Sequence, residues 1–241
     1  LGVIDVDGVS YRFMGKEVST EETPVRFEKA AIQRSVNVLP TQTYYTFECG
    51  PICLDLIFTS PLLLDDLDRM STPVNYISWQ VHATDGKAHE TRLTVEASPS
   101  LAVHSDDQAV TVAFEEENGI SYLKAGTVEQ PVLVRKGDDV RIDWGYFYLA
   151  ARTKKQTEMK VNDRQQLVFS HDMKTMSGSP QSGFLMVGYD DLYSIQYFKD
   201  NRMGYWKHNG KKNIRQAFEG SAEEYRSVMD RCRHFDTRLM E

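Results

Sequence analysis

Residues 43–58 read TYYTFECGPICLDLIF, and this stretch decides the fold class. Apolar side chains occupy every second position on both sides of Gly50 and Pro51, which is the period of a β-strand with one buried face. For the two apolar rows to share that face, the turn around Gly50 and Pro51 must have an even length. The stretch therefore predicts a β-hairpin whose inward row is Tyr45, Phe47, Cys49, Ile52, Leu54, Leu56 and Phe58.

The same pairing predicts that the two neighbouring cysteines point in opposite directions. Cys49 belongs to the inward row and Cys53 to the outward row, which disfavours a disulfide between them. With Cys232 the chain has three cysteines, too few for a disulfide framework. We therefore interpret Cys49 and Cys53 as packing thiols.

Strand-like runs continue on both sides of this hairpin. Residues 3–13, VIDVDGVSYRF, contain two short runs around the turn signal Asp7-Gly8. Many short runs with turn signals between them, and no helical period, predict an antiparallel sandwich rather than a βαβ fold. Further strands are expected at about residues 43–49, 52–59, 74–83, 89–97, 109–115, 120–124, 131–134, 139–149 and 183–188.

The end of the chain has a different period. From Ser221, the sequence SAEEYRSVMDRCRHFDTRLME has apolar residues at spacings of three and four, typical of an amphipathic helix. Ser221 and Glu224 match a capping box, so the helix is expected to begin there. No stop signal precedes Glu241, and we expect the natural chain to continue. The apolar stripe would be Tyr225, Val228, Met229, Cys232, Phe235 and Leu239.

Charge and hydropathy exclude two classes of partner. The formal net charge is -7 and no basic run offsets the acids, so neither a nucleic acid nor an anionic membrane surface is an expected partner. No apolar run approaches the roughly 18 residues of a membrane span. The chain begins at Leu1 without a visible signal peptide, and we expect it to be a piece of a longer protein.

Two groups of residues were tested as metal sites. Strand alternation places His82 outward and His89 inward near the rim, on either side of a three-residue loop at 85–87, so a shared metal ion is not expected. The run LLLDDLDRMS at 62–71 lacks the glycine and the distal glutamate of a calcium loop. We interpret it as a solvated connection between sheets, and we expect no metal and no cofactor.

Catalytic motifs are absent from the sequence. It contains no G-x-S-x-G, no H-E-x-x-H and no glycine-rich phosphate loop. Asp190 and Asp191 are neighbours that an extended chain cannot aim at one point, which argues against a carboxylate pair. The acidic run EEENG at 115–119 reads as a strand end that enters a turn.

Four separated blocks resemble the N-terminal region of the glutaminase A family of bacteria and fungi. They occur in the order of the family and together cover most of the chain. The blocks are DGVSYRFMG at 7–15, the whole stretch 41–98, RIDWGYFYLA at 141–150, and YDDLYSIQYF at 189–198 followed by YWKHNG at 205–210.

The resemblance implies a parent protein with an N-terminal β-sandwich joined to a helical (α/α)6 domain. It also implies an exported amidohydrolase, periplasmic or extracellular, that converts L-glutamine to L-glutamate and ammonia. The catalytic residues of such a protein would lie mainly in the helical domain, and no motif of known catalytic role falls on this chain. The catalytic residues are therefore unknown, and the chain alone is expected to be inactive.

These observations predict a mainly β fold with a large antiparallel β-sandwich, supersandwich-like by resemblance, and a C-terminal amphipathic helix. We predict a sandwich domain at 1–188, an interdomain linker at 189–220, and at 221–241 the first helix of the (α/α)6 domain. The partners implied for the chain are that helical domain and, in the parent, the small substrate glutamine.

The predicted linker supplies the candidate site. Residues 188–210 read GYDDLYSIQYFKDNRMGYWKHNG, too irregular for one strand and too polar for a core helix. We predict that this segment faces the helical domain, at an interdomain surface or at the rim of the active cleft; the alternative is a linker packed on its own sandwich. The candidate residues are Tyr189, Asp190, Asp191, Tyr193, Gln196, Tyr197 and Trp206.

Two other functions stay open at this point. The chain could be a carbohydrate-binding or accessory sandwich domain of a glycoside hydrolase with an (α/α)6 barrel, because fold alone does not separate the two. An exposed row of coplanar aromatic rings would favour sugar binding, but Trp79 is predicted to point inward. A complete small enzyme is the least favoured function, because no nucleophile or metal set is recognisable.

Overall fold

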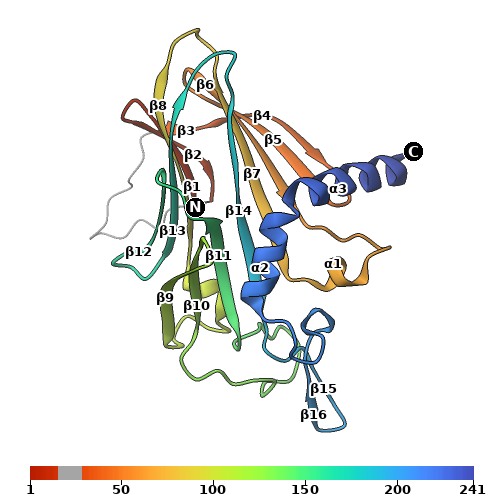
Figure 1. Ribbon diagram of the computed structural model, residues 1–241. Coiled ribbons are helices and arrows are strands. Elements are labelled where there is room, and N and C mark those ends of the chain that lie inside the picture. Colours follow the sequence, from red (N-terminus) through yellow and green to blue (C-terminus); the bar gives the residue numbers. More distant parts are fainter. Residues whose placement is uncertain (16–28) are drawn as a thin grey trace.

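The computed structural model describes residues 1–15 and 29–241. Its strands form two packed sheets, and two helices cover part of the outer face of the larger sheet (Figure 1). The protein is thus mainly β, a large β-sandwich followed by helices, which confirms the predicted fold class.

Each sheet combines strands from distant parts of the chain. All neighbouring strands run antiparallel except the last two of the smaller sheet. In spatial order the smaller sheet consists of β12 (Thr157–Val161), β13 (Leu167–Thr175), β8 (His89–Ala97), β1 (Gly2–Val6), β2 (Val9–Met14) and β3 (Lys29–Ala30). The larger sheet consists of β4 (Ile32–Val38), β5 (Gln42–Cys49), β6 (Ile52–Thr59), β7 (Val74–Ala83), β14 (Gln181–Asp190), β11 (Tyr146–Arg152), β10 (Ile120–Thr127) and β9 (Val110–Glu117).

The described residues form two hydrophobic cores. The first lies between the sheets and includes Ile4, Leu54 and Phe169, each at most 1% exposed. The second lies between the larger sheet and the helices, where Tyr76 and Phe218 are buried. Central strands of the larger sheet are therefore covered on both faces, so that β11 is buried almost throughout instead of alternating.

The decisive hairpin is confirmed. Cys49 lies opposite Ile52, with Gly50 and Pro51 as a two-residue turn. Cys49 is fully buried, Cys53 is partly exposed, and all three cysteines are free. The first hairpin is confirmed as well, with Val6 opposite Val9.

The predicted pairing of 74–83 with 89–97 is wrong. Both segments are strands at the expected residues, but β7 belongs to the larger sheet and β8 to the smaller one. Their apolar rows face each other across the first core instead of lying side by side. Alternation shows that each strand has one buried face. It does not show to which sheet each strand belongs.

Other strand boundaries differ from the prediction. No strand forms at 131–134, and β11 begins only at Tyr146. β4 was missed although Ile32, Val36 and Val38 alternate along it, and all its side chains are exposed in the structure. β12 and β13 were missed too.

The predicted single helix is in fact two. Helix α2 (Ile214–Glu223) begins at a capping box formed by Asn213 and Gln216, and α3 (Tyr225–Met240) follows directly. The capping box predicted at Ser221 is wrong, because Ser221 is buried inside α2. No side chain caps the start of α3.

The remaining elements are short. A hairpin of β15 (Ile195–Tyr197) and β16 (Asp200–Arg202) projects from the end of the sandwich (Figure 1), followed by a 3-10 turn, η2 (Tyr205–Lys207). Another 3-10 turn, η1 (Pro99–Ala102), follows β8. The run at 62–71 contains a short helix, α1 (Leu67–Ser71). It connects β6 with β7 in the same sheet, whereas we predicted a connection between two sheets. None of the described helices combines the length and the apolar character that a bilayer span requires.

Candidate functional site

The base of the candidate segment is fixed by a buried ion pair. Lys207 Nζ lies 2.6 Å from Asp190 Oδ1, and the two side chains are 9% and 11% exposed. The same ammonium group donates a hydrogen bond to the Leu192 carbonyl at 3.1 Å and lies 5.2 Å from the centre of the Trp206 ring. Asp190 and Trp206 therefore hold the segment to the sandwich.

A second set of contacts fixes the start of the segment. The Tyr189 hydroxyl donates to the Trp144 carbonyl at 2.7 Å, and Trp144 Nε1 donates to the Tyr193 carbonyl at 3.0 Å. Burial raises the pKa of Tyr189, which keeps its donor proton in place. At Gly145, with φ of +80°, a Cβ would lie 2.1 Å from the Asp190 carbonyl oxygen, so a glycine is required there.

The tip of the segment is built differently. Phe198 and Lys199 form the two-residue turn between β15 and β16 with φ of +46° and +72°, although this turn type prefers Asn and Gly. The ring centres of Tyr197 and Phe198 lie 4.5 Å apart. Gln196 Nε2 donates a hydrogen bond to Asn201 Oδ1 at 3.1 Å. Strained turns of this kind are frequent in segments that recognise a ligand or a partner.

Large apolar side chains are exposed on this tip and on two neighbouring segments. Phe198 is 84% exposed. In Figure 1 the loop that carries α1, the end of α3 and the β15–β16 hairpin all project on the same side of the molecule. We call the following set the apolar rim: Leu62, Leu64, Leu67, Ile195, Tyr197, Phe198, Met203, Tyr205, Leu239 and Met240.

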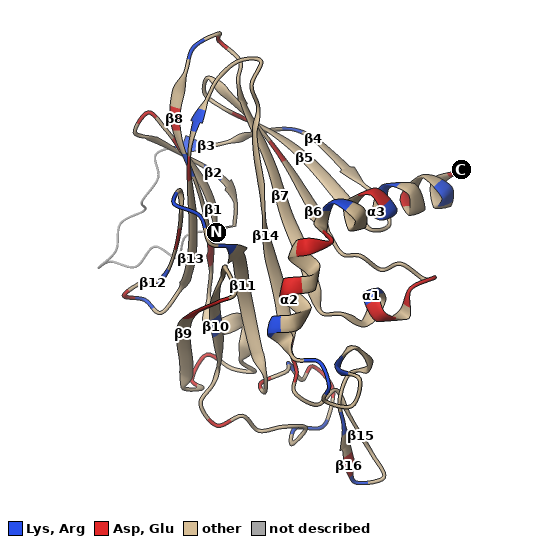
Figure 2. Cartoon of the chain, viewed as in Figure 1, with Lys and Arg blue, Asp and Glu red and all other residues tan. Residues whose placement is uncertain are grey.

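Ion pairs connect the three segments of the apolar rim. Asp66 Oδ2 accepts from Arg231 Nη1 of α3 at 2.8 Å, and Asp68 Oδ1 lies 2.9 Å from His208 Nε2. A backbone N–H at the start of α1, and then Arg231, lower the pKa of Asp66. The acids at 66–68 therefore have partners within the protein, Arg231 and His208. Figure 2 shows acidic and basic residues interspersed along α2 and α3 around these contacts.

The structure divides the predicted site residues into two groups. Asp190 and Trp206 are buried, and Tyr189, Asp191 and Tyr193 are half-buried, so these five anchor the segment. Gln196 and Tyr197 are exposed and can contact a partner. Their interface role stays a prediction.

Sequence reasoning missed most of the apolar rim. The run of leucines at 62–64 was a visible signal, but it was treated as part of an acidic connection. Phe198 lay within the quoted segment and was not selected, because its exposure depends on the turn conformation at Phe198 and Lys199.

A separate apolar hollow of about 360 Å³ opens beside β5 and β6. Gln33, Thr43 and Tyr45 are its polar residues, and none of its lining residues is an acid, a histidine or a cysteine. Such a lining suits apolar contact rather than acid–base chemistry. It is formed by Phe13, Met14, Gln33, Thr43, Tyr45, Phe47, Leu56 and Phe58.

Comparison with known proteins places most of the chain in one family. The family described as "Domain of unknown function (DUF5127)" matches residues 41–168 and 154–241. A glutaminase A of Aspergillus oryzae (strain ATCC 42149 / RIB 40) is 28% identical over 153 residues, which are 62% of this chain and 20% of that protein. The chain thus spans about a fifth of the length of this curated relative.

The similarity among solved structures is more distant. A putative kojibiose phosphorylase from the human microbiome superposes with a TM-score of 0.45 at 11% identity. The match covers 81% of this chain and 23% of that one.

Proposed function

Because the chain belongs to the family described as a domain of unknown function (DUF5127), we propose that it is the non-catalytic N-terminal β-sandwich domain of a glutaminase A-like amidohydrolase. Two observations support this assignment: the 28% identity to a glutaminase A, of which the chain spans 20%, and the four sequence blocks in family order. The parent protein would hydrolyse L-glutamine to L-glutamate and ammonia.

The apolar rim is the observation that carries the proposal. Large apolar side chains are exposed on all three segments, and contacts of Asp66 with Arg231 and of Asp68 with His208 connect the segments. Exposed apolar surface of this kind often marks an interaction site. The proposed occupant of this surface is the (α/α)6 domain of the same protein. The buried anchors at Asp190 and Lys207 keep the hairpin rigid, which lowers the entropy cost of docking.

The sandwich would then act by position rather than by chemistry. Tyr197 and Phe198, at the tip of the hairpin, would pack on the helical domain near the rim of its cleft. The reacting groups would be supplied by the helical domain. Export of the parent protein, to the periplasm or outside the cell, is part of the same proposal.

An assay of ammonia release from glutamine tests the assignment. The natural full-length protein should release ammonia, and the 241-residue chain should not. Release by the pure chain that a point substitution within it abolishes would overturn the non-catalytic role. A full-length protein that is inactive on glutamine would overturn the assignment to an amidohydrolase.

A matched pair of variants tests the docking surface. Phe198→Asp should weaken domain docking by about 1–2 kcal/mol, because interface anchors carry energies of this size. Phe114→Asp is the control, since Phe114 is also exposed but lies on β9, outside the apolar rim. Equal effects of the two substitutions on the unfolding of the full-length protein would contradict the docking role.

The carbohydrate-binding alternative gains no support from the aromatic side chains. Trp79 and Trp206 are each 4% exposed. The exposed rings of Tyr197 and Phe198 meet at an interplanar angle of 72°, so they do not form a coplanar platform.

A further inference from the structure

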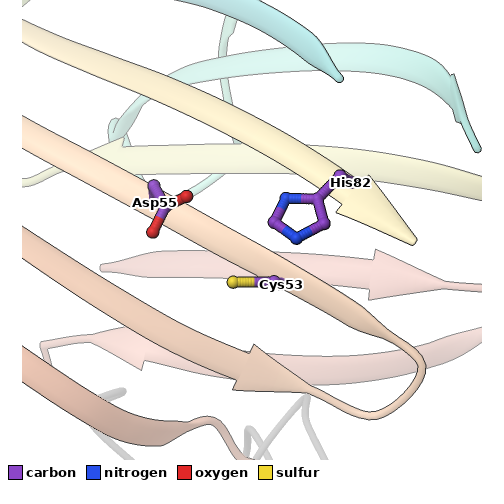
Figure 3. Close-up of side chains that lie close together, drawn as sticks. All are labelled: Cys53, Asp55 and His82. Atoms are coloured by element: carbon purple, nitrogen blue, oxygen red, sulfur yellow. The ribbon is translucent and has the colours of Figure 1, made fainter. Parts of the chain in front are cut away.

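Three metal-ligating side chains of different kinds meet on the outer face of the larger sheet. Cys53 and Asp55 are two residues apart on β6, so they point to the same side, and His82 of β7 lies directly opposite Cys53. The Cys53 Sγ, a ring nitrogen of His82 and a carboxylate oxygen of Asp55 all lie within 4.8 Å of one another. Figure 3 shows the three side chains around a common space.

The fold makes little use of these groups. Within residues 1–15 and 29–241, neither the Cys53 thiol nor the His82 imidazole has a hydrogen bond or an ion pair. Asp55 accepts one hydrogen bond, from Thr46 Oγ1 to Oδ1 at 2.7 Å. All three side chains are half-buried. A sulfur, a nitrogen and an oxygen donor are thus brought together with their binding capacity largely free.

We propose that Cys53, Asp55 and His82 bind a divalent zinc-class cation. Thiolate and imidazole ligands favour Zn²⁺ over Mg²⁺ or Ca²⁺, which prefer oxygen ligands. In a tetrahedral zinc site with bonds of about 2.0–2.3 Å, neighbouring donor atoms lie about 3.3–3.8 Å apart. Small side-chain rotations on two adjacent strands bring the three donor atoms to these separations.

The surroundings complete the site. Thr46 lies opposite Asp55 on β5, and its hydrogen bond orients the carboxylate as outer-shell partners of metal ligands do. Glu48, opposite Cys53, adds a negative charge nearby but is engaged by Arg34. The fourth position is therefore assigned to water.

Two carboxylates lie beside the Cys53 thiol. Asp55 is two positions along β6, and Glu48 lies opposite Cys53 on β5. Their negative charges favour a divalent cation at this place. Zinc binds the thiolate, so binding would release the thiol proton and zinc affinity would rise with pH.

The helix layer leaves the site open to solvent. Tyr225, at the start of α3, covers the same sheet face as far as Ser78, where its hydroxyl donates a hydrogen bond at 2.8 Å. Asp55 and Gln80 lie beyond it and line an open hollow of about 340 Å³. Asp55 is the proposed ligand that lines this hollow, while Cys53 and His82 are half-buried outside its lining.

Sequence analysis considered Cys53 and His82 as candidate residues, but it did not place them side by side. His82 was tested with His89, and Cys53 with Cys49, because those partners are close in sequence. The pairing of β6 with β7 brings together side chains that are 29 positions apart, Cys53 and His82. The expectation of no metal is thereby replaced by this proposal.

Zinc and cobalt titrations of the chelator-treated, reduced protein test the proposal. Isothermal titration should show one Zn²⁺ per chain. Co²⁺ should give the near-ultraviolet absorption of a thiolate bond, which Cys53→Ser should abolish. His82→Asn and Asp55→Asn should each weaken Zn²⁺ binding at least about tenfold, and Thr46→Val about tenfold.

Matched controls make the outcome unambiguous. His234→Asn and Asp65→Asn change exposed residues of the same types and should leave the affinity unchanged. Circular dichroism of each metal-free variant shows whether it is folded. If Cys53→Ser does not fold, the zinc affinity of His82→Asn tests the proposal instead. No saturable binding, a thiolate absorption that persists in Cys53→Ser, or an unchanged affinity in His82→Asn would overturn the proposal.

Discussion

His89 joins two turns at one end of the sandwich. Its Nδ1 lies 2.6 Å from Asp7 Oδ2, in the first hairpin, and its Nε2 lies 3.0 Å from Asp85 Oδ1, in the connection between the sheets. Hydrogen bonds that His89 donates to Asp7 and then to Asp85 raise the pKa of His89 above 6.5. His89 in turn lowers the pKa of both carboxyls below 3.8.

These shifts predict a pH-dependent contribution to stability. The charged contacts are complete above the ordinary carboxyl pKa of 3.8 and below the ordinary imidazole pKa of 6.5, and they are lost as pH rises through the raised pKa of His89. The difference in urea midpoint between the native chain and His89→Asn should therefore be largest near about pH 5 and smaller above the raised pKa. His234→Asn, in an exposed position on α3, is the control. A difference in urea midpoint between the native chain and His89→Asn that does not change with pH would contradict this prediction.

The three thiols should differ in reactivity. Burial raises the pKa of Cys49 to about 12 and also raises the pKa of Cys232, and both side chains are fully buried. Cys53 is partly exposed, so iodoacetamide should modify it first in the native protein. After denaturation without reductant, mass spectrometry should find all three modified. A bridge between Cys49 and Cys53 would contradict the hairpin register.

At the scale of elements, the buried pair of Asp190 and Lys207 decides how firmly the hairpin is held. Removing one partner of a buried pair leaves an unpaired charge, which costs about 3–5 kcal/mol. Lys207→Met should therefore lower the free energy of unfolding by about 3 kcal/mol.

Adding Asp190→Asn to Lys207→Met should recover part of that loss, because the amide oxygen can still accept the Leu192 N–H. Lys199→Met, on the exposed turn of the hairpin, is the control and should change stability by less than about 0.5 kcal/mol. Urea denaturation measures all three. A double variant no more stable than Lys207→Met would argue that the charge pair is not the cause.

Local elements could be predicted where the residues that decide them are adjacent in sequence. The hairpin around Gly50 and Pro51 followed from alternation alone, because its turn fixes the register. Alternation did not predict the partners of β7, because long connections separate β7 from β6 and from β14 in the sequence. The start of α2 was missed because two capping-box patterns lie close together in the sequence, at Asn213 and at Ser221, and only the first forms.

The candidate site shows the same limit. The segment at 189–206 was recognised from its composition. Which of its residues are anchors depends on the contacts of Lys207 with Asp190 and of Trp144 with Tyr193, and these residues are far apart in sequence. The acidic run at 115–117 also has a partner that no local pattern indicates: Arg215 of α2 contacts Glu115 and Glu117. These contacts attach the helices to β9.

At the scale of the whole molecule, the helices form a third layer. Val228, Met229 and Cys232 of α3 are buried against the larger sheet. The Thr41 N–H and hydroxyl both donate to Asp236 Oδ1 at 2.8 Å, which fixes the helix to the β4–β5 turn. Most of the predicted stripe is thus covered by the sandwich itself.

The outer end of α3, the hairpin and the loop that carries α1 therefore remain exposed for a further partner. Leu239 and Met240 are exposed, as are Tyr197 and Phe198. Amide exchange at 195–203 and in the last turn of α3 should be slower in the natural full-length protein than in the 241-residue chain, because docking would cover both. Amides of Val228 to Cys232 should exchange equally slowly in the two proteins, since their cover is internal.

This contrast between two parts of one helix separates docking from a general gain in stability. A general gain would slow exchange throughout α3, whereas docking would slow it only where the apolar rim is covered. Hydrogen exchange with mass spectrometry at low protein concentration resolves the two, because self-association of the exposed rim is then suppressed. If residues 195–203 exchange at the same rate in both proteins, the segment packs wholly on its own sandwich. The interface role of Gln196 and of the apolar rim would then have to be withdrawn, while the zinc proposal, which rests on Cys53, Asp55 and His82, would stand.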